Sequence, residues 1–173
     1  MMKYLAYGSN LHPARLQQRV PSANLQGVTV LQGWRLNFHK RSEDGSGKCS
    51  IEHVGSVEPA TAVHAAVFLI DPEEKPDLDR VEGVGCGYYI EFLEVPGFGD
   101  VFTYIASPDY IDIKLQPYQW YRHLVLAGCH FHGFPESYRQ MIAEVESRAD
   151  PNEARHGENM KIIQDDRSKP LSR

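Results

Sequence analysis

The sequence predicts an α+β fold, with a single mixed β-sheet or a barrel made from it and helices packed on its surface. Three observations predict this class: strand patterns fill most of the first two thirds of the chain, helix signals are inserted between them, and two helical stripes follow. The 173 residues suit one domain, because a chain of this length can bury about 70% of the surface that its unfolded form exposes. We therefore expect one domain over residues 1–152 and a polar C-terminal tail over residues 153–173.

The composition excludes several classes of function. Hydrophobic residues make up 42% of the chain and charged residues 24%, and the net charge of −5 argues against nucleic-acid or anionic-membrane partners. Every apolar run is far shorter than the roughly 18 residues of a membrane-spanning helix. The cysteines are odd in number, and the chain begins on a strand pattern without a signal sequence. We therefore expect a cytoplasmic protein whose thiols at Cys49, Cys86 and Cys129 are free.

The first element is an apolar strand that starts at Tyr4 and breaks at the turn Gly8-Ser9-Asn10. Gly8 can take backbone angles closed to other residues, and Ser9 and Asn10 both make good helix N-caps, so a helix can follow directly. The buried side of this helix would be Leu11, Leu16 and Val20. Such a junction directs backbone N–H groups and the positive end of a helix dipole to one point, where a carbonyl or anionic oxygen fits. The alternative is a simple turn whose donors face water.

The next segments alternate between strands and turns. A period of two over residues 27–40 predicts two strands joined near Gly33, and the residues from Arg41 to Pro59 read as an exposed loop or hairpin tip because they are rich in Gly, Ser and acids. The run Ala62 to Ile70 is apolar on both faces, which predicts a central strand covered on both sides.

Helices become more frequent in the second half of the chain. Asp71 followed by proline predicts the start of a short helix that ends at Glu82, before a Gly-rich segment. Two strands, residues 88–95 and 101–106, are expected to pair as a hairpin. A long helix should run from Pro117 to Gly133.

A second helix should follow at once and end before Asp150. Its apolar stripe would be Tyr138, Met141, Ile142 and Val145. From Glu153 onward the chain is polar and mixed in charge, which predicts a loosely attached tail.

Glu82 is the strongest candidate for a chemical role. It stands at the predicted end of a helix, where the helix dipole is unfavourable to a carboxylate, and glycines follow that leave the backbone room for a ligand. A local conflict of this kind indicates function. The alternative is a solvated glutamate in front of a flexible turn.

Two motifs together resemble the γ-glutamylcyclotransferases. That family has a Tyr-Gly-Ser-Asn turn near the N-terminus, matched by residues 7–10, and then Leu-Asp-x-x-Glu-Gly-Val-x-x-Gly-x-Tyr, matched by residues 78–89. The similarity continues through Pro117-Tyr118, residues 133–135 and residues 150–152, so it spans most of the chain. Related cyclotransferases that act on γ-glutamylamines or on glutathione alone usually have Thr-Leu or Ser-Leu after Tyr-Gly, whereas this chain has Ser-Asn.

The resemblance implies an enzyme that converts γ-glutamyl-amino acids or peptides into 5-oxoproline and the free amino acid. It makes Glu82 the general base and acid and has Tyr118 close the pocket, with no cofactor and no metal. The γ-glutamyl unit would be bound by Tyr4, Leu5, Ala6, Tyr7, Gly8 and Ser9. The expected partner is the small γ-glutamyl substrate, and the expected state is a monomer or homodimer. Cys86, in the run Gly85-Cys86-Gly87, departs from the family pattern, so the resemblance does not fix the width of the leaving-group pocket.

The chemistry of this reaction fits such a site. The substrate's own α-amine attacks its γ-carbonyl, so the enzyme needs a base and oxygen donors and no nucleophile of its own. Holding amine and carbonyl in a near-attack geometry can lower the barrier by roughly 7–11 kcal/mol, and each oxyanion donor by about 3 kcal/mol more.

Four other interpretations compete with this one. Cys86 could be the nucleophile of a hydrolase, but nothing places a base beside it. The histidines and cysteine of residues 129–132, with His123, could bind a metal, but they point in different directions on a helix. A non-catalytic module that senses a γ-glutamyl metabolite would have no need of Glu82. A γ-glutamylamine or ε-lysyl leaving group stays open.

Overall fold

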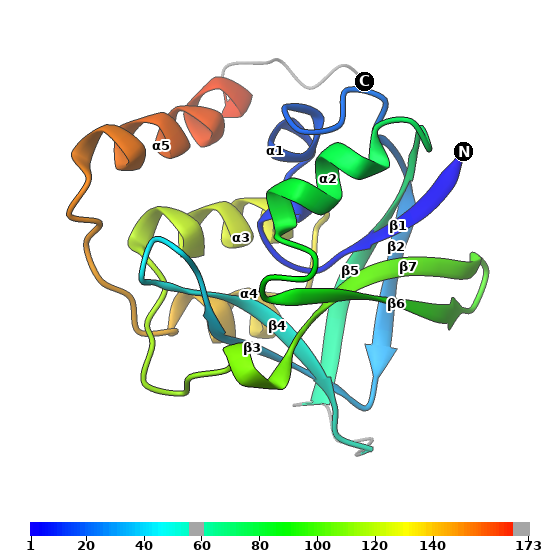
Figure 1. The fold of residues 1–173 in the computed structure, drawn as a ribbon, viewed down its shortest axis with the longest axis horizontal. Helices are drawn as coiled ribbons and strands as arrows, with labels where there is room; N and C mark the ends of the chain where they lie inside the picture. Colours follow the sequence, from blue (N-terminus) through cyan, green and yellow to red (C-terminus); the bar gives the residue numbers. More distant parts are fainter. Residues whose placement is uncertain (56–60, 168–173) are drawn as a thin grey trace.

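The computed structural model of the chain describes residues 1–55 and 61–167 and shows a mixed sheet with helices packed on it (Figure 1). The sheet has five strands in the order β2 (Asn24–Gln32), β5 (Ala62–Ile70), β1 (Met2–Ala6), β7 (Gly99–Ala106) and β6 (Tyr88–Val95). A second, antiparallel pair consists of β3 (Trp34–Arg41) and β4 (Gly47–His53). This arrangement confirms the predicted α+β class.

Strand β1 lies at the centre of the sheet. It pairs antiparallel with β5 over its whole length and parallel with β7 through Tyr4 and Phe102. The side chains of Leu5 and Ala6 are fully buried, as expected for a strand with a neighbour on each side. The turn that follows β1 therefore starts from a rigid position in the middle of the molecule.

Three predicted strand segments are confirmed. The break between β2 and β3 falls at Gly33, whose φ of 77° lies in the left-handed region. Strand β5 is buried on both faces of the sheet. Its neighbouring residues Val67 and Phe68 point to opposite faces, and each is at most 1% exposed. Strands β6 and β7 form the expected antiparallel hairpin.

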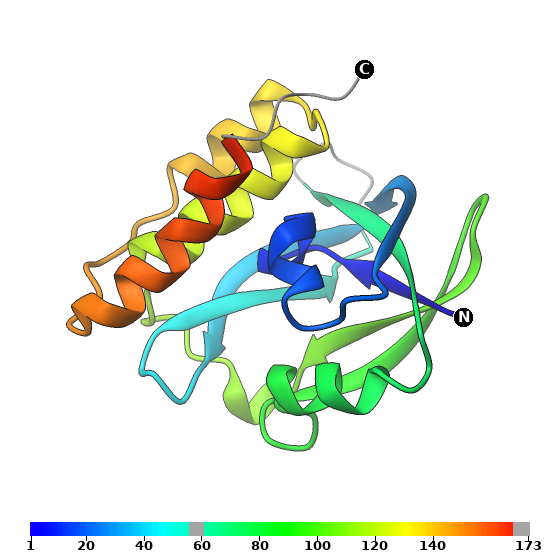
Figure 2. The ribbon, with the colours of Figure 1, turned by 90° about the horizontal axis from the view of Figure 1, so that it is seen from above.

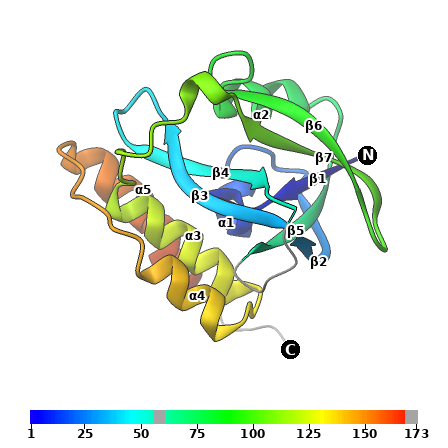
Figure 3. The same cartoon turned by 90° about the horizontal axis from the view of Figure 1, so that it is seen from below.

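The helices lie in two places around the sheet. Helices α3 (Gln119–Phe131), α4 (Glu136–Ala143) and α5 (Glu153–Arg167) run side by side on one side of the molecule (Figure 2). Figure 3 shows the β3–β4 hairpin between this helical layer and the β6–β7 hairpin. Helices α1 (Pro13–Gln17) and α2 (Lys75–Glu82) and the 3₁₀ turns η1 (Ser9–Leu11) and η3 (Pro108–Tyr110) complete the described elements. No helix in the described part of the chain is long and apolar enough to span a membrane.

Strand β4 corrects the prediction of an exposed loop or hairpin tip over residues 41–59, because the hairpin turn covers only residues 42–46. Residues 47–53 pair with β3, and Cys49, Ser50 and Ile51 are buried. Gly47 lies so close to β3 that a Cβ there would be 2.1 Å from the carbonyl oxygen of Phe38. Gly47, one of the residues that suggested a loop, is therefore needed for close strand packing. Residues 56–60 lie outside the described part.

The C-terminal segment corrects a second prediction, that of a loosely attached tail. Residues 153–167 form α5, which packs on α3 and buries Ile162 and Ile163. The side-chain oxygen of Asn152 accepts a hydrogen bond from the Arg155 N–H at 3.0 Å, a cap that starts the helix. Two buried isoleucines are too few to give a clear stripe in a segment otherwise rich in charge. Residues 168–173 lie outside the described part.

Smaller differences concern the ends of helices. Helix α1 ends at Gln17, so Val20 is buried beyond it, and α4 ends before Val145. Met141 is 39% exposed and does not belong to the buried stripe of α4. Element boundaries depend on tertiary contacts that periodicity does not contain.

Candidate active site

A cavity lies where the turn after β1 meets the C-terminal end of α2. Its lining comes from several elements and is rich in tyrosine: Tyr4, Tyr7, Gly8, Ser9, Asn10, Cys49, Glu82, Tyr88, Tyr104 and Tyr121. The two motifs that stood far apart in the sequence therefore meet at one place. This is the principal candidate for an active site.

Glu82 is held at this cavity by the way α2 ends. Gly83 follows it with a φ of 74°, a left-handed conformation that stops the helix, and the N–H of Val84 returns to the carbonyl of Asp79 at 3.0 Å. The Glu82 side chain is 18% exposed. Its oxygen Oε1 accepts hydrogen bonds from Asn10 Nδ2 at 2.9 Å and from Arg19 Nη1 at 2.6 Å. These two donors offset the unfavourable helix dipole at Glu82.

Arg19 and Asn10 are site residues that sequence reasoning missed. Arg19 Nη1 also donates to Asn10 Oδ1 at 2.8 Å, so the turn, the cation and the carboxylate form one connected group. A signal for Arg19 did exist, because a carboxylate at a helix C-terminus in a partly buried site needs a cation. The sequence alone does not say which of the scattered Arg and Lys residues supplies it.

The tyrosine hydroxyls around the cavity are fixed by hydrogen bonds. Tyr4 accepts from Asn10 Nδ2 at 2.9 Å, and Tyr7 donates to the carbonyl of Tyr104. The Tyr104 hydroxyl in turn donates to Asp79 Oδ1 at 2.7 Å. The lining is therefore a rigid set of dipoles.

Burial keeps these hydroxyls neutral. It raises the pKa of Tyr4 and of Tyr104 well above the usual range, and the nearby Glu82 charge raises them further. Burial also raises the pKa of Tyr121, whose hydroxyl accepts a hydrogen bond from the Cys49 N–H at 3.0 Å. None of these tyrosines can act as a base at neutral pH, which leaves Glu82 as the basic group of the lining.

Gly8 is required for space. Its φ of −111° is negative, but its ψ of −138° lies outside both the helical and the extended regions, which agrees with the expectation that Gly8 takes backbone angles closed to most residues. A Cβ at this position would lie 3.0 Å from Cys49 Cβ and 3.3 Å from the Tyr121 hydroxyl. Ser9 and Asn10 lie inside the 3₁₀ turn η1 and make no side-chain cap, which differs from the expected N-caps. Their N–H groups have no acceptor within that turn, as at the start of any helix.

The other predicted site residues divide into two groups. Tyr4, Tyr7, Gly8 and Ser9 line the cavity, whereas Leu5 and Ala6 are fully buried in β1. Leu5 and Ala6 belong to the core that supports the turn.

The structure places Tyr118 away from the cavity. Its hydroxyl donates to the carbonyl of Asp44 at 2.8 Å. Tyr121, less than one helical turn further along α3, lines the cavity instead. Among the residues at the start of this segment, Tyr121 therefore lines the cavity and Tyr118 does not.

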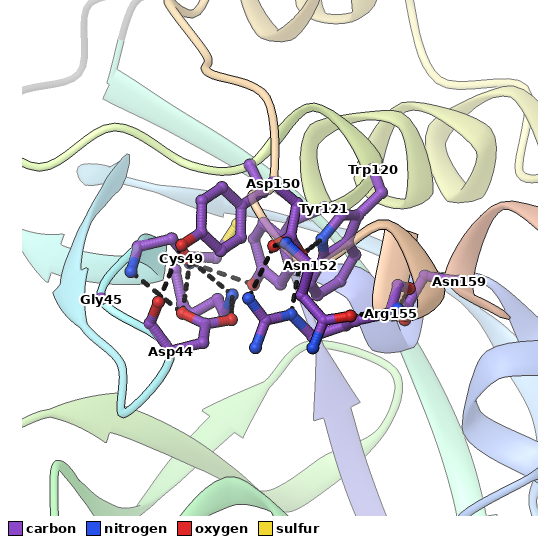
Figure 4. A network of polar contacts seen from close by, with 12 residues as sticks. Asp44, Gly45, Cys49, Trp120, Tyr121, Asp150, Asn152, Arg155 and Asn159 are labelled. Atoms are coloured by element: carbon purple, nitrogen blue, oxygen red, sulfur yellow. Dashed lines mark hydrogen bonds and ion pairs between the residues drawn. The ribbon is translucent and has the colours of Figure 1, made fainter. Parts of the chain in front are cut away.

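A polar network joins the β3–β4 turn to the starts of α3 and α5 (Figure 4). Tyr118 belongs to it through its hydrogen bond to the Asp44 carbonyl. In it, Asp150 accepts from Trp120 Nε1 at 2.7 Å and from two nitrogens of Arg155, each at 2.7 Å. The hydrogen bonds from Arg155 hold the pKa of Asp150 below its usual range. Lys48 Nζ lies 2.7 Å from Asp44 Oδ2, and burial lowers the pKa of Lys48. This network fixes the wall of the cavity that contains Cys49.

The cysteines and histidines are not arranged as a nucleophile or metal site. Cys86 is exposed in its glycine-rich turn. Cys49 lines the cavity, but burial raises its pKa, which keeps the thiol protonated. His132 Nε2 pairs with the carbonyl of Leu11 at 2.7 Å and His130 Nδ1 with Arg139 at 2.9 Å. Within residues 1–55 and 61–167, no three His, Cys, Asp or Glu side chains are grouped so that they could hold a metal ion.

Comparison with known proteins gives relatives in sequence and in structure. No protein-family model matches the chain. The human γ-glutamylcyclotransferase is 28% identical over 151 residues, which cover 83% of this chain and 78% of that protein. The mouse γ-glutamylcyclotransferase is also 28% identical, over 158 residues, which cover 87% of this chain and 79% of that protein.

A solved structure described as a γ-glutamyl cyclotransferase superposes with a TM-score of 0.76 at 23% identity and covers 95% of this chain and 98% of its own. A human protein of uncharacterised function superposes with a TM-score of 0.75 at 24% identity, covering 94% of this chain and 98% of its own. These similarities confirm the resemblance indicated by residues 7–10 and 78–89: the chain is a sequence relative of γ-glutamylcyclotransferases and has their α+β fold.

Proposed function

We propose that the protein is a γ-glutamylcyclotransferase, with Glu82 as its general base and acid. The observation that carries the proposal is the hydrogen bond of 2.9 Å between Asn10 Nδ2 and Glu82 Oε1. It brings the basic group of the cavity lining next to a turn that offers backbone N–H groups. A base and oxygen donors are what intramolecular cyclisation requires.

In this reaction the α-nitrogen of the substrate forms a bond to the carbon of its own γ-carbonyl group, and the bond from that carbonyl carbon to the leaving nitrogen breaks. The α-nitrogen starts as an ammonium group and gives up two protons, and the leaving nitrogen gains two. Atoms and charge therefore balance without water, a nucleophile of the enzyme or a redox partner. The product is 5-oxoproline together with the free amino acid or peptide.

Glu82 carries the proton between the two nitrogens. Among the described residues, both donors to its side chain bind Oε1, which leaves Oε2 to accept the proton of the α-nitrogen. Arg19 and Asn10 act through Glu82 and are positioning residues. They hold the carboxylate in one orientation, because two fixed donors on one oxygen allow it little rotation.

The turn after β1 binds the γ-carbonyl oxygen. N–H groups at the start of η1, in the segment Gly8 to Asn10, meet the charge that develops on this oxygen during attack. The buried and hydrogen-bonded tyrosines of the lining then exclude water and restrict the γ-glutamyl chain to conformations close to ring closure. Orientation of this kind can lower the barrier by roughly 7–11 kcal/mol.

The proposal includes the conditions under which the enzyme works. We expect a small-molecule γ-glutamyl substrate, glutathione among the candidates, and action in the cytoplasm as a monomer or homodimer without a cofactor.

A substrate panel tests this function. The purified protein is incubated with γ-glutamyl-amino acids, glutathione and γ-glutamylamines, and release of 5-oxoproline is followed. Glu82→Gln should lower kcat by at least about a hundredfold with little change in substrate affinity, because it keeps the shape and loses the base. Cys86→Ser is the matched control and should keep the wild-type rate.

The possible results separate the alternatives. A normal rate in Glu82→Gln removes Glu82 from the mechanism, and loss of activity in Cys86→Ser revives a cysteine hydrolase. Tight binding of γ-glutamyl compounds without any 5-oxoproline indicates a metabolite-binding module. Release from γ-glutamylamines alone indicates a γ-glutamylamine cyclotransferase.

A further inference from the structure

A second cavity lies between the β3–β4 hairpin and the β6–β7 hairpin, apart from the candidate active site. Its volume is about 480 Å³, which lies in the range of small-molecule sites. Successive side chains of a strand point to opposite faces. Tyr88 and Tyr104 line the active-site cavity, whereas the residues that follow them, Tyr89 and Ile105, line the second cavity. The β6–β7 hairpin is therefore a wall between two cavities.

Strand β4 brings an unpaired polar group to the second cavity. Cys49 lines the active-site cavity, and the next residue, Ser50, lines the second one. Ser50 is only 4% exposed, yet no hydrogen bond joins its hydroxyl group to any residue that the structure describes. Buried hydroxyl groups normally have a partner. The Ser50 hydroxyl is therefore free to bind a ligand that enters the second cavity.

The charged groups of the second cavity are acidic. Among the described residues that line it, Glu52 and Glu91 carry negative charge and none is Lys or Arg. Glu91 is half-buried on β6, and within the described part of the chain no hydrogen bond or ion pair holds its carboxylate. Glu52 has described partners on one oxygen only, because Asn37 at 3.0 Å and Arg35 at 3.5 Å both bind Oε1. The second cavity therefore favours a cation over an anion.

The rest of the lining is mostly aromatic and apolar. Trp34 and Tyr89 belong to it, and the faces of such rings attract cations. Ile51 and Ile105 also line it and are 2% and 8% exposed, so they offer apolar surface to a ligand. A metal ion fits less well, since no three His, Cys, Asp or Glu side chains of the described residues are grouped to hold one. The lining suits an organic cation with an apolar body.

We propose that the second cavity binds an organic ammonium compound with an apolar or aromatic body. The ammonium group forms charge-assisted hydrogen bonds with Glu91, and the ring of Tyr89, on the same face of β6, stabilises its charge further. The body of the ligand packs on Ile51 and Ile105.

This site goes beyond the proposed cyclotransferase function and does not depend on it. The described linings of the two cavities have no residue in common. A γ-glutamyl substrate, 5-oxoproline and a released amino acid all carry a carboxylate, which Glu52 and Glu91 repel. The ligand of the second cavity is therefore neither the substrate nor a product of the proposed reaction.

Equilibrium dialysis of the wild type with three compounds of similar shape tests the proposal. At neutral pH, 2-phenylethylamine is a cation, 2-phenylethanol is neutral and 3-phenylpropionate is an anion. The protein should bind 2-phenylethylamine with a Kd of about 1 mM or lower, a modest affinity for so small a ligand. Binding of 2-phenylethanol should be at least about tenfold weaker, because a hydrogen bond between charged groups is lost. 3-Phenylpropionate should not bind.

Variants of β6 then locate the bound compound. Glu91→Gln keeps the shape of the side chain and loses its charge, so it should weaken the binding of 2-phenylethylamine by about tenfold. Glu91→Lys should abolish this binding and admit 3-phenylpropionate. Glu94→Gln is the matched control, because Glu94 is exposed on the same strand and does not line the cavity. It should bind 2-phenylethylamine as the wild type does, and thermal melts show that each variant folds.

Four results would overturn the proposal. Equal binding of 2-phenylethylamine and 2-phenylethanol means that the carboxylates select no cation, and no binding at about 10 mM means that the site does not exist. An unchanged affinity in Glu91→Gln places the compound elsewhere. Displacement of 2-phenylethylamine by γ-glutamyl-alanine, measured in Glu82→Gln, assigns the cavity to the substrate. A wild type that releases no 5-oxoproline contradicts the proposed function alone, because none of these binding measurements requires turnover.

Discussion

Arg19 Nη1 lies 2.6 Å from Glu82 Oε1, and this ion pair joins two segments separated by 63 residues of sequence. Both side chains are mostly shielded from water, with 17% and 18% of their surface exposed. The pair fixes the position of the candidate base relative to the turn after β1, because the same Arg19 nitrogen also binds Asn10. Its loss should therefore change activity more than stability.

Arg19→Gln should lower kcat for 5-oxoproline release by about tenfold to a hundredfold, since a misplaced base loses much of the benefit of orientation. Arg19→Lys should recover part of this loss because it keeps the charge without the fork of donors. The check is kcat and KM for both variants beside a thermal melt. An unchanged kcat in Arg19→Gln shows that Glu82 needs no such support.

Gly8→Ala should lower both kcat and substrate affinity. The added Cβ meets Cys49 Cβ at 3.0 Å and the Tyr121 hydroxyl at 3.3 Å, so the turn or the wall must shift. Donors to the reacting oxygen need distances of about 2.7–3.1 Å, which such a shift disturbs. Ser9→Ala removes only a hydroxyl group and should lower kcat by less than about tenfold, which corresponds to roughly 1.4 kcal/mol in the activation free energy.

The test is to measure kcat and KM for both variants, with thermal melts to show that they fold. The result decides whether the backbone N–H groups of the turn or the Ser9 hydroxyl binds the reacting oxygen. If Gly8→Ala is fully active and Ser9→Ala is inactive, backbone N–H groups of the turn are not the essential donors. The Ser9 hydroxyl then has a chemical role.

Local signals explain what the sequence predicts well. The alternation in β2 and β3, the double-sided apolar run of β5 and the glycine stop after Glu82 all act within a few residues, and the structure has each of them. The meeting of the Gly8 turn with Glu82 is a long-range fact. It is expected only because the two motifs occur together in a family.

The features that could not be predicted depend on tertiary contacts. Strand β4 forms because β3 provides a partner, and α5 because α3 covers Ile162 and Ile163. The pairing of Arg19 with Glu82 and the choice of Tyr121 over Tyr118 depend on side-chain directions that sequence spacing leaves open. The close approach of Gly8 to Cys49 and Tyr121 could not be predicted, because a single sequence does not reveal which neighbour fills the space beside a glycine.

Gly128→Ala should destabilise the fold and weaken the site together. In α3, a Cβ at Gly128 would lie 2.5 Å from Leu11 Cβ and 2.9 Å from the His12 nitrogen, so the helix could no longer pack on η1. Overpacking of this kind costs about 1–3 kcal/mol, and a protein of this size loses about 2–4 °C in melting temperature per kcal/mol.

Gly157→Ala is the matched control for this prediction. Gly157 lies in helix α5, and a Cβ added there would meet no described atom within 4 Å. Alanine at this position should raise the melting temperature slightly, because glycine in a helix costs roughly 0.5–1 kcal/mol. If the two variants melt alike, the close approach of α3 to η1 does not limit stability.

Asp150→Asn should reduce stability in a way that depends on pH. Arg155 holds the pKa of Asp150 below its usual range. The charged form therefore stabilises the folded state at pH values above about 4, which is the ordinary pKa of an aspartate side chain. The benefit should fall by about 1.4 kcal/mol per pH unit below that value. At neutral pH we expect a loss of about 2–4 kcal/mol, because Arg155 and Trp120 lose a charged partner.

Urea unfolding of the wild type and Asp150→Asn at pH 7, 5 and 3 measures this difference. It should be equal at pH 7 and 5 and smaller at pH 3. A difference that is constant over all three pH values assigns the effect to shape and not to charge.

The central position of β1 has a consequence for biosynthesis. Strand β1 is translated before its partners β5 and β7 and before Glu82. Until Phe102 has left the ribosome, β1 has no parallel neighbour, and the turn at Gly8 lacks its full support. Contacts so distant along the chain slow folding. The turn after β1 is thus synthesised before the segments that complete it and gains its final shape only after they have joined the sheet.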